Sequence, residues 1–274
     1  MKRFTGKVAV ITGAGSGIGR ALALELSRRG ARLALSDVDA DRAAATAEQA
    51  GAAARSYRLD VSDRAAVLAH AEEVAGDFGQ VNLVVNNAGV ALGATVEEMS
   101  WADYDWLMGI NLGGVVNGTK AFLPHLIASG DGHIVNISSV FGFIGVPTQS
   151  AYNAAKFAVR GFTESLRQEM LIAGHRVGVS CVHPGGIKTN IVRDSRNAGG
   201  EDPEQAAAGF EKIARTSPEK AALTIVRGIE RRSARILIGP DAYVLDAIPR
   251  VLGSAYQRPA AMLARLGLKQ MGGH

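Results

Sequence analysis

Short hydrophobic runs alternate along the chain with longer segments in which apolar residues recur at helical spacing. The runs predict buried strands, and the longer segments predict helices with one apolar face. The strands predicted in this way cover residues 7–11, 32–36, 55–59, 81–85, 134–137, 176–182 and 235–240. Because strands alternate with helices, we expect an α/β fold: a doubly wound, seven-stranded and mostly parallel sheet with helices on both faces.

The helical pattern is longest in two segments. One runs from Ser100 to about Leu126 and carries the polar Asn111 within its apolar face. The other contains Tyr152 and runs on to about Ala173. Apolar residues also recur at helical spacing beyond the last predicted strand, which predicts a C-terminal helical extension over residues 241–274.

The composition indicates one domain, residues 1–274. The chain is 47% apolar and contains no Pro/Gly/Ser linker, repeat or low-complexity tract. Its single cysteine, Cys181, lies in an apolar run, which predicts a buried thiol in a reducing compartment. Residues 1–7 lead directly into a strand, and no apolar segment is long enough for a signal peptide or a membrane span. We therefore expect a soluble, cytoplasmic protein.

The formal charge of +4 is concentrated in a basic tail, since seven Lys/Arg and two Asp follow from Arg231 onward. A solvated face of a terminal helix is the favoured interpretation of this tail, and contact with an acidic membrane surface is the alternative. The sequence contains no helix-turn-helix or aromatic–basic alternation, so no nucleic-acid partner is expected. The six histidines lack the spacing of metal ligands, and no metal is expected.

A glycine-rich turn follows the first predicted strand and precedes a helix. The turn reads Thr12-Gly13-Ala14-Gly15-Ser16-Gly17-Ile18-Gly19. Glycines let the backbone approach a pyrophosphate, and the free N–H groups of the helix's first turn point at it. Strand, turn and helix together therefore predict a dinucleotide site.

The second predicted strand leads to Asp37, about twenty residues beyond the turn. A carboxylate at this position accepts hydrogen bonds from the adenosine ribose and repels a 2′-phosphate. Asp39 adds to that repulsion, and no arginine immediately follows Asp37. The sequence thus favours NAD over NADP; the alternative is that Asp37 is only a helix N-cap or turn residue.

Tyr152 and Lys156 are four residues apart, so they share one face of a helix. A free tyrosine has a pKa near ~10, and a nearby ammonium group lowers it. We therefore expect Tyr152 to exchange a proton near neutral pH, with Ser139 donating a hydrogen bond to the same substrate oxygen. Taken alone, the pair is also consistent with an ordinary exposed Tyr/Lys pair.

Four polar residues follow predicted strands directly: Asp37, Asp60, Asn87 and Ser139. Ligands of parallel α/β sheets bind beyond the carboxyl ends of the strands. We therefore expect these side chains to gather at one site.

In their order and spacing these motifs resemble the short-chain dehydrogenases/reductases of ordinary length, a family with a Rossmann-type domain. The resemblance covers about residues 5 to 240, and it rests on Thr12-Gly13-x-x-x-Gly17-x-Gly19, Asn87-Ala88-Gly89, Asn111, Ser139, Tyr152-x-x-x-Lys156 and Pro184-Gly185. It implies an NAD(P)-dependent oxidoreductase that acts on CH–OH groups. It also implies a homodimer or homotetramer, packed through the helices that carry Asn111 and Tyr152.

The resemblance implies a role for each motif residue. Tyr152 would be the acid/base and Lys156 would lower its pKa, while Ser139 would polarise the substrate oxygen and Asn111 would position a water. Ser138 is the alternative serine, but the spacing favours Ser139. The implied cofactor-binding residues are Gly13, Ser16, Gly17, Ile18, Gly19, Asp37, Asp60, Val61, Asn87, Ala88, Gly89, Tyr152, Lys156, Pro184, Gly185, Ile187 and Thr189.

The substrate pocket is expected between the loops after Ser139 and Asn87 and a segment that begins near residue 190. Its candidate contacts are Phe141, Phe143, Gln149 and Ile191. Residues 190–216 include a glycine-containing insertion and predict a lid. The mostly apolar candidates predict a small-molecule secondary alcohol or ketone with a hydrophobic body. The apolar stripes of the C-terminal extension are expected to lie against a partner subunit or the rim of this pocket.

Two other functions stay open on the sequence. A catalytically inactive dinucleotide-binding regulatory module would keep the glycine turn, but such proteins usually lack the tyrosine or the lysine. An epimerase or dehydratase would use the same cofactor, but normally with a longer substrate domain. The physiological substrate and the direction of reaction do not follow from the fold.

Overall fold

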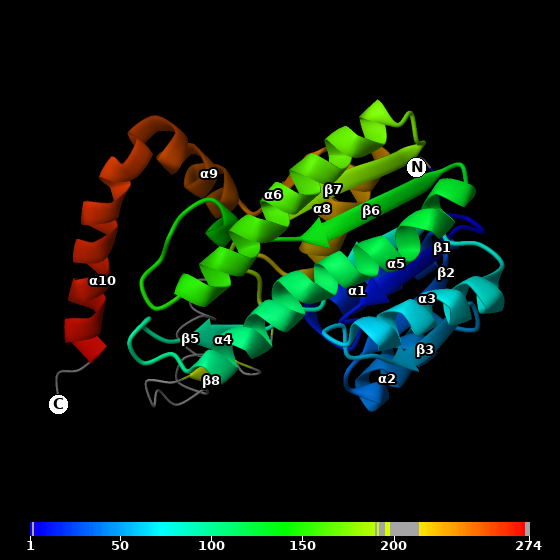
Figure 1. Cartoon of the computed structure of the whole chain (residues 1–274), viewed down its shortest axis with the longest axis horizontal. Coiled ribbons are helices and arrows are strands. Elements are labelled where there is room, and N and C mark those ends of the chain that lie inside the picture. Colours follow the sequence, from blue (N-terminus) through cyan, green and yellow to red (C-terminus); the bar gives the residue numbers. More distant parts are fainter. Residues whose placement is uncertain (2, 190, 192–194, 198–213, 272–274) are drawn as a thin grey trace.

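The structure is a computed structural model that describes residues 1, 3–189, 191, 195–197 and 214–271 (Figure 1). Its centre is a sheet of seven strands in the order β3-β2-β1-β4-β6-β7-β9. Every neighbouring pair in this sheet is parallel. The strands are β1 (Val8–Thr12), β2 (Arg32–Asp37), β3 (Ala54–Arg58), β4 (Leu83–Asn86), β6 (Gly132–Ile137), β7 (Val177–Pro184) and β9 (Arg235–Ile238). The predicted α/β sheet is confirmed.

Helices cover both faces of the sheet (Figure 1). One face packs against α1 (Gly17–Arg28), α2 (Ala40–Ala50) and α8 (Pro218–Glu230), and the other against α3 (Arg64–Phe78), α5 (Gly114–Ala128) and α6 (Ser150–Ile172). In β1 the side chains of Ala9 and Ile11 lie in the first layer, and those of Val8 and Val10 lie in the second. A strand buried on both faces must be apolar throughout, which explains the continuous hydrophobic runs.

The strand order reverses between β1 and β4. The chain builds β1, β2 and β3 outward to one edge and then returns to add β4 on the other side of β1. In parallel α/β sheets, ligands bind at such a reversal, beyond the carboxyl ends of the strands. The glycine turn follows β1 and Asn87 follows β4, so both lie at this reversal.

The helix predicted from Ser100 to about Leu126 is interrupted. It consists of α4 (Trp101–Met108), a π-helical turn (Gly109–Gly113) and α5. The side chain of Ser100 caps α4 by accepting a hydrogen bond from the N–H of Asp103. A π turn contains one more residue than an α-helical turn, and such turns are common at functional sites. Asn111 lies at its centre.

Two further elements among the described residues were not predicted from the sequence. A short parallel pair joins β5 (Leu92–Gly93) to β8 (Arg196–Asn197). Val140–Gly142, directly after Ser139, form a 3-10 turn, η2. Most of the predicted lid, 190–216, lies outside the described residues.

The predicted C-terminal extension is helical. It contains α9 (Pro240–Leu252), a 3-10 turn η3 (Gly253–Tyr256) and α10 (Gln257–Met271). Figure 1 shows α9 beside the loop between β6 and α6, and α10 leading away from the sheet. No helix among the described residues is both long and apolar enough to cross a membrane.

Candidate active site

The glycine turn is packed so closely that its glycine positions have no room for a side chain. Gly13 and Gly17 have φ angles of 64° and 52°, which favour glycine. A Cβ on Gly13 would lie 2.8 Å from the Cα of Ala88, and one on Gly19 would collide with the carbonyl oxygen of Gly13. This bare backbone at the start of α1 fits a pyrophosphate group.

Asn87 and Thr12 fix the turn against the end of β4. The amide of Asn87 donates to the carbonyl oxygens of Thr12 and Gly13 at 2.9 and 3.0 Å. The hydroxyl oxygen of Thr12 accepts from the N–H groups of Asn87 and Ala88, both at 3.1 Å. The structure therefore brings two predicted cofactor motifs together, and it assigns the Asn87 side chain to holding the turn.

Asp37 lies where its carboxylate faces the same turn. Its Oδ2 accepts from the N–H of Gly15 at 2.9 Å, and its Oδ1 accepts from the N–H of Asp39 at 3.1 Å. The N-cap of α2 is Asp39, whose carboxylate accepts from the N–H of Arg42, so Asp37 is not the cap of this helix. The other part of the alternative, a turn residue, fits the bond that Asp37 accepts from the N–H of Asp39. The carboxylate of Asp37 is thus held at the end of β2, where a ribose would bind.

Sequence reasoning missed Arg42, whose Cβ lies against the glycine turn at Gly15, as the Asp37 carboxylate does. Arg42 pairs with Asp39 at 3.2 Å, and a Cβ on Gly15 would meet the Cβ of Arg42 as well as the Asp37 carboxylate. No arginine directly follows Asp37 in the sequence. Arg42 is five positions later, and the first turn of α2 brings it back to the glycine turn. The first turn of α2 is the signal that could have revealed it.

Asp60 and Val61 lie beyond the end of β3. The carboxylate of Asp60 accepts from the N–H and hydroxyl of Ser62 at 2.9 and 2.7 Å. Val61 is buried, and its carbonyl accepts from the amide of Asn117 at 3.0 Å. Their predicted contact with adenine stays a prediction.

Tyr152 and Lys156 lie one turn apart near the start of α6, and the structure brings them together with Ser139. The Nζ of Lys156 lies 5.4 Å from the centroid of the Tyr152 ring and donates to the carbonyl oxygen of Ile137 at 3.1 Å. Ser139 hydrogen-bonds to Tyr152. The hydroxyl of Ser138 instead donates to the carbonyl oxygen of Lys156 at 2.8 Å, so of the two serines Ser139 is the one beside the tyrosine.

The expected lowering of the Tyr152 pKa is not found, and this prediction was wrong for the protein alone. Burial raises the pKa of Tyr152 to about 12, although the hydrogen bond from Ser139 acts in the opposite direction. Burial also lowers the pKa of Lys156 to about 8. Desolvation disfavours both charged forms and is the largest cause of both shifts in pKa. A further positive charge beside Tyr152 would favour the phenolate.

Asn111 occupies the centre of the π turn and is fully buried. Its side chain makes two hydrogen bonds to the backbone of Val90: Oδ1 accepts from the N–H at 2.8 Å, and Nδ2 donates to the carbonyl at 2.9 Å. A Cβ on Gly89 would lie 3.2 Å from Oδ1 of Asn111 and 3.5 Å from Nζ of Lys156. Gly89, Asn111 and Lys156 therefore converge, while the water predicted at Asn111 stays a prediction.

The segment that leads out of the end of β7, residues 184–189, contacts the glycine turn; we call it the cofactor loop. The N–H of Gly185 donates to the carbonyl of Ile238 at 2.9 Å, and the N–H of Gly186 donates to the carboxylate of Asp241 at 2.8 Å. A Cβ on Gly17 would lie 3.0 Å from the methyl group of Thr189. The loop thus reaches the glycine turn, as expected for residues that hold the nicotinamide end of a dinucleotide.

The candidate substrate residues differ in their surroundings. Phe141 is partly buried, and its ring meets the ring of Tyr152 edge to face at 6.0 Å. Phe143 is buried, with its ring stacked on His183 at 4.1 Å, so this packing favours a structural role. Gln149 is the partly buried residue before α6, and Ile191 is partly buried in a turn.

His183 contacts the backbone of Ser139. Its Nδ1 lies 3.0 Å from the carbonyl oxygen of Ser139, and burial lowers its pKa to about 4. The ring is therefore neutral near pH 7, and Nδ1 donates to this carbonyl. This contact gives His183 a structural role.

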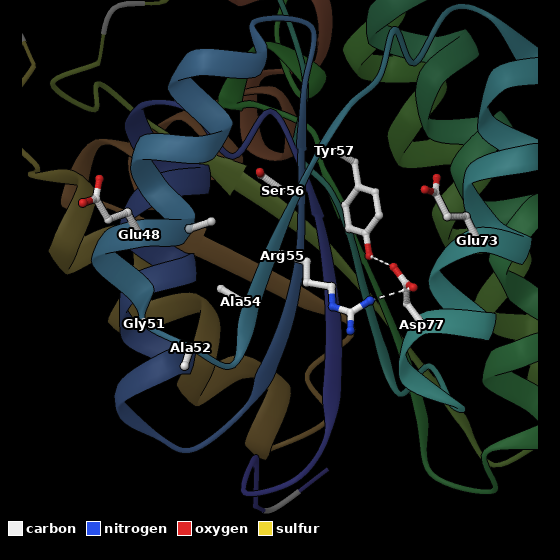
Figure 2. A pocket seen from close by; sticks show the side chains of 10 residues that line it. Glu48, Gly51, Ala52, Ala54, Arg55, Ser56, Tyr57, Glu73 and Asp77 are labelled. Atoms are coloured by element: carbon white, nitrogen blue, oxygen red, sulfur yellow. Dashed lines mark hydrogen bonds and ion pairs between the residues drawn. The ribbon is translucent and has the colours of Figure 1, made fainter.

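A surface pocket of about 650 Å³ lies elsewhere, beside the edge strand β3 (Figure 2). Tyr57 and Arg55 both hydrogen-bond to the carboxylate of Asp77 there, and together with burial this raises the pKa of Tyr57. These polar groups satisfy one another. The residues that line the pocket come from α2, β3, α3 and the α2–β3 turn, and they include none of the predicted site residues.

Comparisons with known proteins agree with this geometry. A family model described as short chain dehydrogenase matches residues 7–199. A Mycobacterium tuberculosis (strain H37Rv) protein that carries the name oxidoreductase SadH is 58% identical over 265 residues, which cover 95% of this chain and 96% of that one.

Two solved structures are similar over most of their length. A short-chain dehydrogenase/reductase from Burkholderia phymatum in complex with NAD has a TM-score of 0.85 at 34% identity, covering 92% of this chain and 95% of that one. A metagenomic short-chain oxidoreductase in complex with NADP has a TM-score of 0.71 at 30% identity, covering 86% and 97%. The chain therefore belongs to the short-chain dehydrogenase/reductase family and is an NAD(P)-dependent oxidoreductase of that family.

Proposed function

We propose that this protein is an NAD-dependent dehydrogenase that transfers hydride between nicotinamide and a hydrophobic secondary alcohol or ketone. The observation that carries the proposal is the grouping of Tyr152, Ser139 and Lys156, with Lys156 near Gly89 in the segment that packs against the glycine turn. An acid/base, an oxygen-binding hydroxyl and a buried cation are the groups that this reaction requires.

Each residue has a distinct task in the proposed reaction. The dinucleotide supplies the hydride acceptor and, in its oxidised form, a positive charge. Tyr152 takes the proton of the alcohol, or returns it in the reductive direction. Ser139 hydrogen-bonds the same oxygen and holds it beside Tyr152. Lys156 contributes a cation that favours the phenolate, and its bond to Ile137 keeps it in place.

The preference for NAD rests on Asp37. Its carboxylate is held by the N–H groups of Gly15 and Asp39, facing the glycine turn. A negative charge there accepts hydrogen bonds from ribose hydroxyls and repels a 2′-phosphate. Arg42 lies nearby, but its pairing with Asp39 reduces the positive charge available to a phosphate. Of the two solved structures described above, the Burkholderia protein is in complex with NAD and the metagenomic protein with NADP, so the preference rests on Asp37.

The substrate class rests on the apolar lining near Tyr152. Phe141 contacts the tyrosine ring, and Leu92 and Leu107 lie in the hydrophobic cluster against which Tyr152 packs. An alcohol with a hydrophobic body would bury apolar surface here. Gln149, at the end of the same loop, is a candidate polar contact.

We also propose a homodimer or homotetramer that packs through α5 and α6. On α6, Phe157, Leu171 and Ile172 expose 42%, 68% and 86% of their surface. Exposed apolar residues gathered on one element favour an interface. Light scattering coupled to size-exclusion chromatography measures the mass, and a monomer at all concentrations would contradict this assembly.

The first experiment is a titration with NADH and NADPH, followed by turnover of isopropanol, cyclohexanol and menthol at alkaline pH with the cofactor that binds more tightly. We expect tighter binding of NADH and formation of NADH from at least one alcohol. Tyr152→Phe should abolish turnover while keeping NADH affinity, and Tyr57→Phe, at the remote edge strand, is the matched control. Tighter binding of NADPH would overturn the role of Asp37. Cofactor binding without turnover would indicate a regulatory module instead.

A further inference from the structure

The first part of the C-terminal extension touches two loops of the site. At its start, the carboxylate of Asp241 accepts a hydrogen bond from the N–H of Gly186 at 2.8 Å. At its end, the hydroxyl oxygen of Tyr256 accepts from the N–H of Gly145 at 3.0 Å. Gly186 belongs to the cofactor loop, and Gly145 belongs to residues 140–149, which we call the substrate loop. Helix α9 joins the two contacts and packs against η2 (Figure 1).

Tyr256 is the residue that anchors the end of this segment. Every other residue from 251 to 259 is exposed, and Val251 and Leu252 expose 80% and 51% of their surface. Tyr256 alone in this stretch is partly buried. Its bond to the substrate loop therefore comes from a stretch of chain that is otherwise exposed to solvent. Tyr256 is the residue that fixes this stretch to the loop.

The substrate loop is held from its other side by Asn153. The amide of Asn153 donates to the carbonyl oxygens of Phe141 and Ile144 at 2.7 and 2.6 Å, and its Oδ1 accepts from the N–H of Val146 at 3.0 Å. Asn153 is the residue after Tyr152 on α6, so these bonds tie the loop to the helix that carries the acid/base. Gly145, exposed at the tip, is bonded by Tyr256 and lies between the residues that Asn153 holds.

We infer that residues 241–256 form a wall of the substrate site, in which Tyr256 holds the tip of the substrate loop and thereby sets the size of alcohol that the site accepts. Asp241 ties the same wall to the cofactor loop. Tyr256 is a positioning residue, because it acts through Gly145 and the loop that carries Phe141. This inference rests on the proposed dehydrogenase function only in its choice of substrates.

The test compares Tyr256→Phe with Tyr243→Phe in the full chain. Both changes remove one hydroxyl, but Tyr243 is 62% exposed on α9. Hydrogen–deuterium exchange of the peptide that contains Gly145 should become roughly fivefold faster in Tyr256→Phe, the effect of losing one ordinary hydrogen bond. The exchange in Tyr243→Phe should match the parent protein. Thermal unfolding of both variants verifies that the fold is intact.

Kinetics test the consequence for substrates. In Tyr256→Phe we expect KM for menthol to change by roughly fivefold, while KM for isopropanol, kcat and the Kd of NADH keep their parent values. Unchanged exchange at Gly145 would overturn the contact, and changed exchange with unchanged KM for menthol would overturn the role in substrate selection. If the parent protein oxidises no alcohol, the proposed function fails, but the exchange experiment still decides whether Tyr256 holds the loop.

Discussion

Acidification should destabilise this protein through three histidines that fold in the neutral state. Burial lowers the pKa of His70 and His183 to about 4 and the pKa of His133 to about 3. In an unfolded chain a histidine titrates near about 6.5. Between these values the unfolded chain binds protons that the folded chain does not, so stability rises with pH across this window. The contribution is complete above about pH 6.5 and is lost as the pH falls below it.

The size of the loss follows from these values. A pH of about 5 lies about 1.5 units below the pKa of an unfolded histidine and still above the pKa of each of the three folded histidines. At about 1.36 kcal/mol per unit, each group costs about 2 kcal/mol, and the three together cost about 6 kcal/mol. A typical domain has a free energy of unfolding of about 5–15 kcal/mol. Moderate acid should therefore remove much of the stability.

Urea unfolding followed by circular dichroism, from about pH 7.5 to about pH 5, measures this loss. His70→Phe should reduce it by about 2 kcal/mol, since the ring of His70 lies edge-on to Tyr57 and Phe122 and its Nε2 has no hydrogen-bond partner. The exposed His175 provides the control, His175→Gln. A total loss below about 2 kcal/mol, or an unchanged loss in His70→Phe, would refute the reasoning. Carboxylates with lowered pKa values lose their contribution at lower pH, below about 4.5.

Three further changes test the cofactor site and the substrate loop. Asp37→Ala should weaken the binding of NADH by roughly tenfold and reduce the preference for NADH over NADPH, both measured by fluorescence titration. An unchanged ratio of the two Kd values would count against Asp37 as the residue that selects the cofactor. Gly19→Ala should abolish NADH binding, because the added Cβ would collide with the carbonyl of Gly13 and lie 2.6 Å from Asn87 Nδ2; retained affinity would contradict this packing. Asn153→Ala should lower the free energy of unfolding by about 2 kcal/mol in urea titrations, since it leaves three loop groups unpaired; a loss below about 0.5 kcal/mol would contradict that.

The sheet could be predicted because its signal is local. Each buried strand must be apolar on both faces, and each is followed by a helix with its own periodicity. The convergence of Asp37 and Asn87 beside the glycine turn followed from the same reasoning, since residues after parallel strands share one edge. These features need no knowledge of how distant elements pack.

Other features depend on that packing and were missed. The pKa of Tyr152 is governed by burial, which α6 and the surrounding loops create together. The contacts of Asp241 with Gly186 and of Tyr256 with Gly145 join residues far apart in the chain, and no short-range pattern marks them. The π turn escaped notice because one extra residue barely alters the helical spacing of the apolar positions.

The π turn also has a consequence for how this helix can change during evolution. Each residue of an α-helix rotates the chain by about 100°, so one additional residue turns everything before it by that amount. Leu107 before the turn packs with Leu92 and Ala155, whereas Phe122 after the turn packs against the sheet. Deleting any one residue of Gly109–Gly113 would restore a regular helix and rotate Leu107 out of its cluster. This segment should therefore tolerate no change of length, in addition to the constraint that the buried Asn111 places on its sequence.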